Sequence, residues 1–144
     1  MTTIREILKA RPTQVWHVPP EATVYEVLEV MAAKDIGAVP IVEKGKLVGI
    51  FSERDCARHL VLKQLSARDT PVRQLMSTPV LYVRPEHTIE DCMALMTHKH
   101  VRHLPVLEGN ELVGVVSMRD VVRHSISGRD HQIEQLEQYI TGSG

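Results

Sequence analysis

The chain has 144 residues, of which 43% are hydrophobic and 24% charged, and its formal net charge is −1 with histidine neutral. This composition is typical of a globular protein, and the near-zero charge gives no general electrostatic attraction for nucleic acid. Aromatic residues make up only 3%, so we expect aliphatic side chains to fill the interior. The opening MTTIREILKARP contains no apolar run of the length that a secretory signal or a membrane span needs, and a cytoplasmic protein without membrane contact is expected.

The sequence repeats itself at an offset of 65 residues. Residues 49–55 read GIFSERD and residues 114–120 read GVVSMRD, and the same offset pairs Pro20 with Pro85 and Pro40 with Pro105. Two copies predict a closed pseudo-symmetric pair rather than a solenoid. Each copy is too short to bury a large core alone, so we expect the two halves to share a core.

Each copy shows the same order of local signals. Short alternating stretches at 14–18 and 80–83 predict a strand, and Thr23 and Thr88 then stand where a helix N-cap belongs. The next segments, 38–51 and 103–116, have the turn residues and β-branched flanks of a hairpin. Ser52 and Ser117 follow as plausible caps of a second helix, which gives the unit order strand, helix, strand, strand, helix.

Two further segments are predicted to be helical. PVRQLM, at residues 71–76, indicates a short helix that leads into the second copy. DHQIEQLEQYI, at residues 130–140, predicts a terminal helix that packs on the domain or on a partner chain.

With this repeat, this unit order and the Gly-x-x-Ser-x-x-Asp ending of each copy, the chain resembles the CBS-domain family. The resemblance covers almost the whole chain, and it implies an α+β fold of two tandem CBS motifs, related by a pseudo-twofold, that form one Bateman module. The expected division is residues 1–66 for the first motif with an N-terminal helix, 67–127 for the second motif and 128–144 for a helical tail. The family also implies a disc-shaped homodimer.

The resemblance implies a ligand that contains adenosine, such as AMP, ADP, ATP, NAD(H) or S-adenosylmethionine. A carboxylate at a helix start can accept hydrogen bonds from both ribose hydroxyls, and guanidinium groups suit phosphate. By this pattern, each copy supplies one aspartate for ribose, one serine for a phosphate or sugar oxygen, and one arginine for phosphate: Asp55, Ser52 and Arg54 in the first copy, and Asp120, Ser117 and Arg119 in the second.

The family pattern also places two walls around the adenine base. They consist of the segments that contain the central prolines: Ala38, Val39 and Pro40 in one copy, and His103, Leu104 and Pro105 in the other. Because the nucleotide-sensing subunit of AMP-activated protein kinase carries a basic pair at the second of these places, Arg102 and His103 are expected to reach phosphates. The two sites should then differ in affinity. The first strands add Thr13, Val15, Thr78 and Val80.

Several alternatives remain open. Each Ser-x-x-Asp can simply cap a helix, with a local ion pair to the adjacent arginine. The spacing of His98, His100 and His103 does not favour a metal site, and we expect none. The sequence lacks a nucleophile–base pair and a Walker-type phosphate loop, so a non-catalytic sensor without a catalytic cofactor is the leading interpretation. The alternative is a protein-interaction module with vestigial clefts, acting through its dimer surface and terminal helix.

Overall fold

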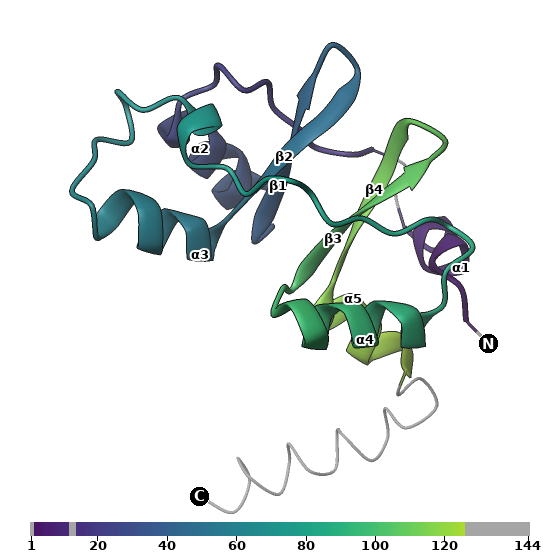
Figure 1. Ribbon diagram of the computed structural model, residues 1–144. Coiled ribbons are helices and arrows are strands. Elements are labelled where there is room, and N and C mark those ends of the chain that lie inside the picture. Colours follow the sequence, from purple (N-terminus) through teal and green to yellow (C-terminus); the bar gives the residue numbers. More distant parts are fainter. Residues whose placement is uncertain (1, 12–13, 126–144) are drawn as a thin grey trace, which may run out of the picture.

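The computed structural model describes residues 2–11 and 14–125, and it contains two similar groups of helices around two hairpins (Figure 1). The elements of the first half are α1 (Ile4–Lys9), α2 (Val24–Lys34), β1 (Ala38–Glu43), β2 (Lys46–Ser52), α3 (Glu53–Asp55) and the π-helix η1 (Cys56–Val61). Those of the second half are the 3-10 helix η2 (Val72–Gln74), α4 (Ile89–Lys99), β3 (His103–Glu108), β4 (Glu111–Ser117) and α5 (Met118–Ser125). The α+β class with two tandem motifs is confirmed. The predicted terminal helix lies outside the described residues.

The predicted caps begin both long helices. The backbone N–H of Glu26 donates to Thr23 Oγ1 (3.2 Å), and that of Asp91 donates to Thr88 Oγ1 (3.1 Å). Asp91 also accepts from the Thr88 N–H (2.9 Å), which completes a capping box and lowers the pKa of its carboxyl. These hydrogen bonds satisfy N–H groups that a helix start would otherwise leave unpaired.

Both predicted hairpins are present with matching registers. β1 pairs antiparallel with β2 from Ala38↔Ser52 to Glu43↔Lys46, and β3 pairs with β4 from His103↔Ser117 to Glu108↔Glu111. The first turn places Lys44 and Gly45 at φ values of 51° and 78°, as a type I′ turn requires. The pairing shifts at the same place in both hairpins, after Ile41 and after Val106.

The strands predicted at 14–18 and 80–83 are each reduced to a single parallel bridge, Val18↔Ile41 and Val83↔Val106. Val18 donates to Pro40 O (3.2 Å) and its carbonyl accepts from Val42 N–H (2.9 Å). Extending this parallel ladder would require N–H donors at positions 20 and 40, and both residues are prolines. The second copy has prolines at the equivalent positions, 85 and 105, so the ladder ends after two hydrogen bonds there as well.

The segment before each motif packs on the other motif. Ile4 and Ile7 of α1 belong to the core that contains α4, β3, β4 and α5, and Figure 1 shows α1 at that end of the molecule. Conversely, Val72 and Leu75 belong to the core of the first motif. The expected boundary at residues 66 and 67 therefore separates sequence units, whereas the packing crosses it twice.

The two crossings use equivalent contacts. Arg5 bonds to Glu86 (2.9 Å) and Glu108 (2.6 Å) of the second motif, and Arg73 bonds to Glu21 (2.9 Å) and Glu43 of the first. The acidic partners are related by the 65-residue offset, whereas Arg5 and Arg73 are 68 residues apart. The leading segments, defined here as residues 2–8 and 70–76, thus form a second repeat with its own offset.

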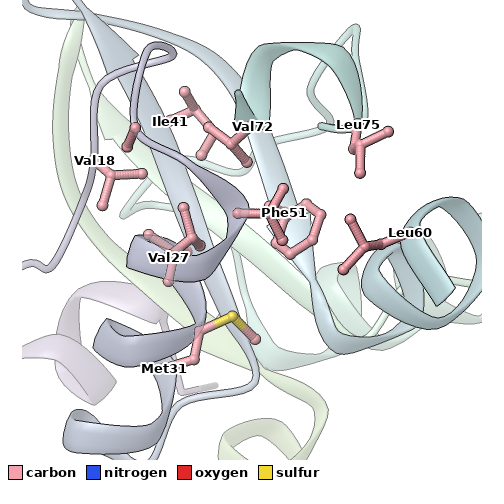
Figure 2. Close-up of a cluster of buried hydrophobic side chains, with 11 residues drawn as sticks. Val18, Val27, Met31, Ile41, Phe51, Leu60, Val72 and Leu75 are labelled. Carbon is pink, nitrogen blue, oxygen red and sulfur yellow. The ribbon is translucent and has the colours of Figure 1, made fainter. Parts of the chain in front are cut away.

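Aliphatic side chains fill the interior, as the composition predicts, but the expectation of one core shared by both halves is wrong: the buried side chains form two clusters, and each is completed by one leading segment. In the first core, Phe51 of β2 is fully buried among side chains of α2, η1 and the second leading segment (Figure 2). The fully buried members of the second core include Ile4, Ile7, Cys92, Leu104, Val106, Val116 and Val121. Within the described ranges, no helix combines the length and the apolar character needed to span a lipid bilayer.

Candidate functional site

The repeated heptads begin with a glycine that allows a leading segment to approach the hairpin. A Cβ atom on Gly49 would lie 2.3 Å from Met76 Sδ, and one on Gly114 would lie 2.6 Å from Leu8 Cδ2. Both distances are shorter than real Cβ contacts allow. These two glycines therefore let each leading segment lie directly on the other motif's hairpin, beside the aspartate that ends the heptad.

Both aspartates form capping boxes with the serine three residues earlier. Asp55 Oδ2 accepts from Ser52 N–H (2.9 Å) and Oγ (3.0 Å), and Asp120 Oδ2 accepts from Ser117 N–H (2.8 Å) and Oγ (3.0 Å). The capping interpretation therefore describes part of what these residues do. What distinguishes the two copies is the other carboxylate oxygen.

The Asp120 cleft is a cavity of about 1370 Å³ that combines residues of both motifs. The first copy contributes Ala38 and Pro40, and the second contributes Ser117, Arg119 and Asp120. Val15, Trp16, Arg102, His103 and Arg123 also line it. Asp120 Oδ1 has no hydrogen-bond partner among the described residues, which leaves an acceptor free at the start of α5.

Arg11 occupies the Asp120 cleft beside that carboxylate. Its Nη1 lies 3.4 Å from Asp120 Oδ2, and its Nη2 donates to Val115 O (3.0 Å). Its Nε is buried and has no acceptor among the described residues. Arg11 is therefore close to Asp120, yet its guanidinium uses few of its five donors.

The carboxylate of Asp55 is enclosed instead. Its Oδ1 accepts from Ser77 Oγ (3.0 Å), and its side chain is 11% exposed, against 21% for Asp120. His59 Nε2 lies 4.0 Å from the same oxygen. Both carboxylate oxygens of Asp55 thus have protein partners.

The two arginines of the heptads also differ. Arg54 donates through Nη1 to the carbonyl of His100 (2.8 Å), the left-handed C-cap residue of α4. It therefore satisfies a helix C-terminus of the other motif. Arg119 is exposed and lines the Asp120 cleft, and its guanidinium makes no hydrogen bond within the described residues.

His103 reaches the Asp120 cleft from β3. A Cβ atom on Gly37 would lie 3.2 Å from His103 Nε2 and 3.0 Å from Glu53 Oε1, so a larger residue than glycine at position 37 would crowd both groups. Burial lowers the pKa of His103, with Arg102 acting in the same direction, while Glu53 and Asp120 act against this shift. His103 is consequently neutral at physiological pH, and it can accept or donate one hydrogen bond in the cleft.

The remaining predicted residues occupy varied surroundings. Val39 and Leu104 are fully buried in the two cores, and Pro105 is also buried, so the backbone groups of these positions are what a ligand could contact. Val80 is half-buried and Thr78 is exposed, in the segment after Ser77. Thr13 lies outside the described residues.

Sequence reasoning missed Arg11, Gly37, Ser77 and Arg123. The signal for Arg11 and Ser77 was present, since residues 4–8 read IREIL and residues 72–76 read VRQLM, 68 residues apart. Four residues separate Leu8 from Thr13, whereas one separates Met76 from Thr78. The three additional residues of the first copy include Arg11, which marks the place where the copies differ.

Thiol and metal chemistry find little support in the described part of the chain. Burial, followed by the charge of Asp91, raises the pKa of Cys92 to about 11, so this thiol stays protonated. Burial also raises the pKa of Cys56. Among residues 2–11 and 14–125, no three His, Cys, Asp or Glu side chains are grouped as a metal site would need.

Comparison with known proteins identifies the fold. Residues 4–62 and 72–127 match the CBS domain, which is most of the chain and both copies of the repeat. The chain belongs to the CBS-domain family. The CBS domain-containing protein YhcV of Bacillus subtilis is 35% identical over 115 residues, which cover 80% of this chain and 81% of that protein.

Solved structures agree with this assignment. A protein with CBS domains from Burkholderia ambifaria is 41% identical, has a TM-score of 0.84, and the match covers 88% of this chain and 95% of that one. The CBS domain pair of protein MJ0100, solved in complex with 5′-methylthioadenosine and S-adenosylmethionine, has a TM-score of 0.75 at 22% identity, with 85% and 94% covered. The latter likeness shows the fold alone. The chain is thus a CBS pair, a regulatory module.

Proposed function

We propose that this CBS pair binds an adenosine-containing ligand, such as AMP, ADP, ATP or NAD(H), in the Asp120 cleft and acts as a non-catalytic sensor of that ligand. The observation that carries the proposal is the free Oδ1 of Asp120, which lies at the start of α5 in a large cleft. A carboxylate with an unused oxygen can accept a ribose hydroxyl without losing its capping hydrogen bonds.

The rest of the cleft suits the other parts of such a ligand. The apolar wall of Ala38 and Pro40 can contact a base, and the exposed guanidinium of Arg119 can bind phosphate. The bound 5′-methylthioadenosine and S-adenosylmethionine of MJ0100 add support, because that protein shares this fold. The surroundings of Asp55 argue for one occupied cleft, since Ser77 already uses its second oxygen.

Calorimetric titration with AMP, ATP, NADH and S-adenosylmethionine tests this function. We expect micromolar binding of at least one ligand by the wild type, with one site per chain, and a loss of about tenfold or more in Asp120→Ala. Asp55→Asn should keep the affinity, because it leaves the Asp120 cleft intact. Absence of binding by all four ligands, in protein whose fold is verified by circular dichroism, would overturn the proposal.

A second function, protein association, is favoured by exposed apolar side chains at the end of η1. Val61 is 63% exposed and Leu62 is 76% exposed, and Leu65 follows at 42%. Such a group of apolar residues is typical of a contact with another chain. We propose a homodimer through this surface. Light scattering of the wild type and of Leu62→Asp tests it: a dimer that becomes a monomer supports the surface, and an unchanged dimer excludes it.

A further inference from the structure

We propose that Arg11 determines the specificity of the Asp120 cleft: its guanidinium leaves Asp120 and pairs with a ligand phosphate, so the cleft selects phosphorylated adenosine compounds. This inference rests on the proposed binding of an adenosine-containing ligand. It adds the ligand class, namely anionic nucleotides in preference to adenosine and to the cationic S-adenosylmethionine.

The guanidinium of Arg11 has few and weak protein partners. The distance of 3.4 Å from Nη1 to Asp120 Oδ2 exceeds the 2.7–2.9 Å of a good charge-assisted hydrogen bond. Val115 O is the one hydrogen-bond acceptor of its guanidinium among the described residues, and the buried Nε donates to none of them. A buried donor without a partner is costly, so an arrangement that satisfies more of the guanidinium would be favoured.

A phosphate provides such an arrangement. When both ribose hydroxyls bind Asp120, one uses the free Oδ1 and the other competes with Arg11 for Oδ2, which leaves a positive charge without a partner in the cleft. A phosphate on the same ligand can accept paired hydrogen bonds from the guanidinium. Arg11 is then paired with the phosphate, and the carboxylate of Asp120 is hydrogen-bonded to the ribose. Adenosine offers no phosphate for this exchange, and a sulfonium would add a second positive charge.

Other charges of the cleft favour an anion. Arg102, Arg119 and Arg123 line it, and none of their guanidinium groups makes a hydrogen bond or ion pair within residues 2–11 and 14–125. Of the five acidic residues that line it, Glu108 is paired with Arg5 (2.6 Å), Asp120 caps α5, and Asp35, Glu53 and Glu111 form no ion pair within the described residues. Six basic side chains thus line the cleft against five acidic ones, and the guanidinium groups of Arg102, Arg119 and Arg123 can add to the attraction of a phosphate.

The Asp55 side lacks an equivalent of Arg11. Ser77 contacts Asp55 there, and the chain is three residues shorter at this place. The neutral hydroxyl of Ser77 cannot leave Asp55 and form an ion pair with a phosphate, as the guanidinium of Arg11 can do at Asp120. The inferred selectivity therefore belongs to the Asp120 cleft alone.

The experiment compares adenosine, AMP, ATP and S-adenosylmethionine on the wild type, Arg11→Ala and Arg11→Gln. Trp16 is the only tryptophan of the chain and lines the same cleft, so its fluorescence reports binding alongside calorimetry. Arg58→Ala, which removes an exposed arginine of η1, is the matched control for net charge.

We expect the wild type to bind AMP at least tenfold more tightly than adenosine. Arg11→Ala should weaken AMP binding about tenfold and leave adenosine binding unchanged or tighter, because Asp120 no longer has to release a cation. S-adenosylmethionine should gain affinity relative to AMP. Arg11→Gln should give the same ratios, and it replaces the alanine variant if that protein does not fold. Arg58→Ala should keep the wild-type ratio.

Two results would overturn the inference and leave the proposed function standing. The AMP-to-adenosine ratio could stay at its wild-type value in both Arg11 variants, or both ligands could lose affinity equally, which would mean that Arg11 only shapes the cleft. If no adenosine-containing ligand binds the wild type, the proposed function fails first and the inference fails with it.

Discussion

Asp55 and Asp120 end nearly identical heptads, cap their helices with the same hydrogen bonds, and yet lie in different surroundings. The second oxygen of Asp55 accepts from Ser77, and Arg54 is bound to the end of α4. The second oxygen of Asp120 is free among the described residues, Arg119 is exposed, and a cavity of about 1370 Å³ adjoins both. One half of the molecule therefore uses the repeated residues for structure, whereas the other half leaves them available.

The cause of this difference lies outside the heptads. The leading segments dock through equivalent contacts, but the chain after them is three residues longer in the first copy. These residues place Arg11 at Asp120, whereas Ser77 meets Asp55. A duplicated unit can thus acquire two roles through a change in a connection, with its motif residues unaltered.

The largest expected effect is on stability, when each aspartate is removed in turn. Asp55→Ala eliminates a capping box and the hydrogen bond from Ser77 at a buried position, and should lower the free energy of unfolding by about 3 kcal/mol. Asp120→Ala loses the equivalent box at a more exposed position, and should cost about 1.5 kcal/mol. Urea denaturation measures both. Equal losses would contradict the larger structural role that the hydrogen bond from Ser77 gives to Asp55.

The glycines at the start of the heptads should also respond unequally. Gly49→Ala brings a methyl group to 2.3 Å from Met76 Sδ and 2.8 Å from its Cγ, so most of the side chain must move, and we expect a loss of about 2 kcal/mol. Gly114→Ala meets mainly the terminal methyl of Leu8, which can rotate away, so about 1 kcal/mol is expected.

Thermal or urea unfolding of the two glycine variants tests this order. The control introduces Gly49→Ala into the variant Met76→Ala, which lacks the clashing Sδ and Cγ atoms. The loss in the free energy of unfolding caused by Gly49→Ala should be smaller in that variant than in the wild type. A larger loss for Gly114→Ala than for Gly49→Ala would show that the two leading segments are not packed as described.

Ser77→Ala tests what closes the Asp55 side. Removal of this hydroxyl leaves Asp55 Oδ1 without its hydrogen bond, and we expect a loss of about 1 kcal/mol in the free energy of unfolding. The ligand stoichiometry measured by calorimetry should stay at one per chain, because the carboxylate remains buried. A stoichiometry of two would mean that Ser77 alone prevents binding there.

The sequence predicts most of the fold because the fold depends on local signals. The caps at Thr23 and Thr88, both hairpins and the order of elements follow from residue types at fixed spacing. The predicted first strands are too long, because prolines at positions 20, 40, 85 and 105 lack the N–H donors that a longer parallel ladder needs.

The site was less accessible to sequence reasoning. Ala38 and Pro40 come from the other copy than Asp120, and the packed structure shows that they line the same cleft. Arg11 has no family motif to mark it, and its contact with Asp120 requires the crossing of the leading segment to the second motif. These contacts depend on packing between segments that are distant in the sequence, and the spacing of residues along the chain does not predict such packing.

The smallest expected effect concerns His103, whose equivalent in the first copy is Ala38, so one half alone carries an ionisable group at this position. Because burial lowers the pKa of His103 below the usual value of about 6.5, the unfolded chain binds a proton more readily than the folded one as the pH falls. His103 should therefore lower the free energy of unfolding as the pH falls from about 6.5 toward its folded pKa, and have no effect at higher pH. Titration of the histidine NMR resonances, with His103→Gln to assign the signal, measures the pKa directly. A value at or above 6.5 without ligand would contradict the buried position, whereas a rise on addition of AMP and none on addition of adenosine would locate the phosphate beside His103.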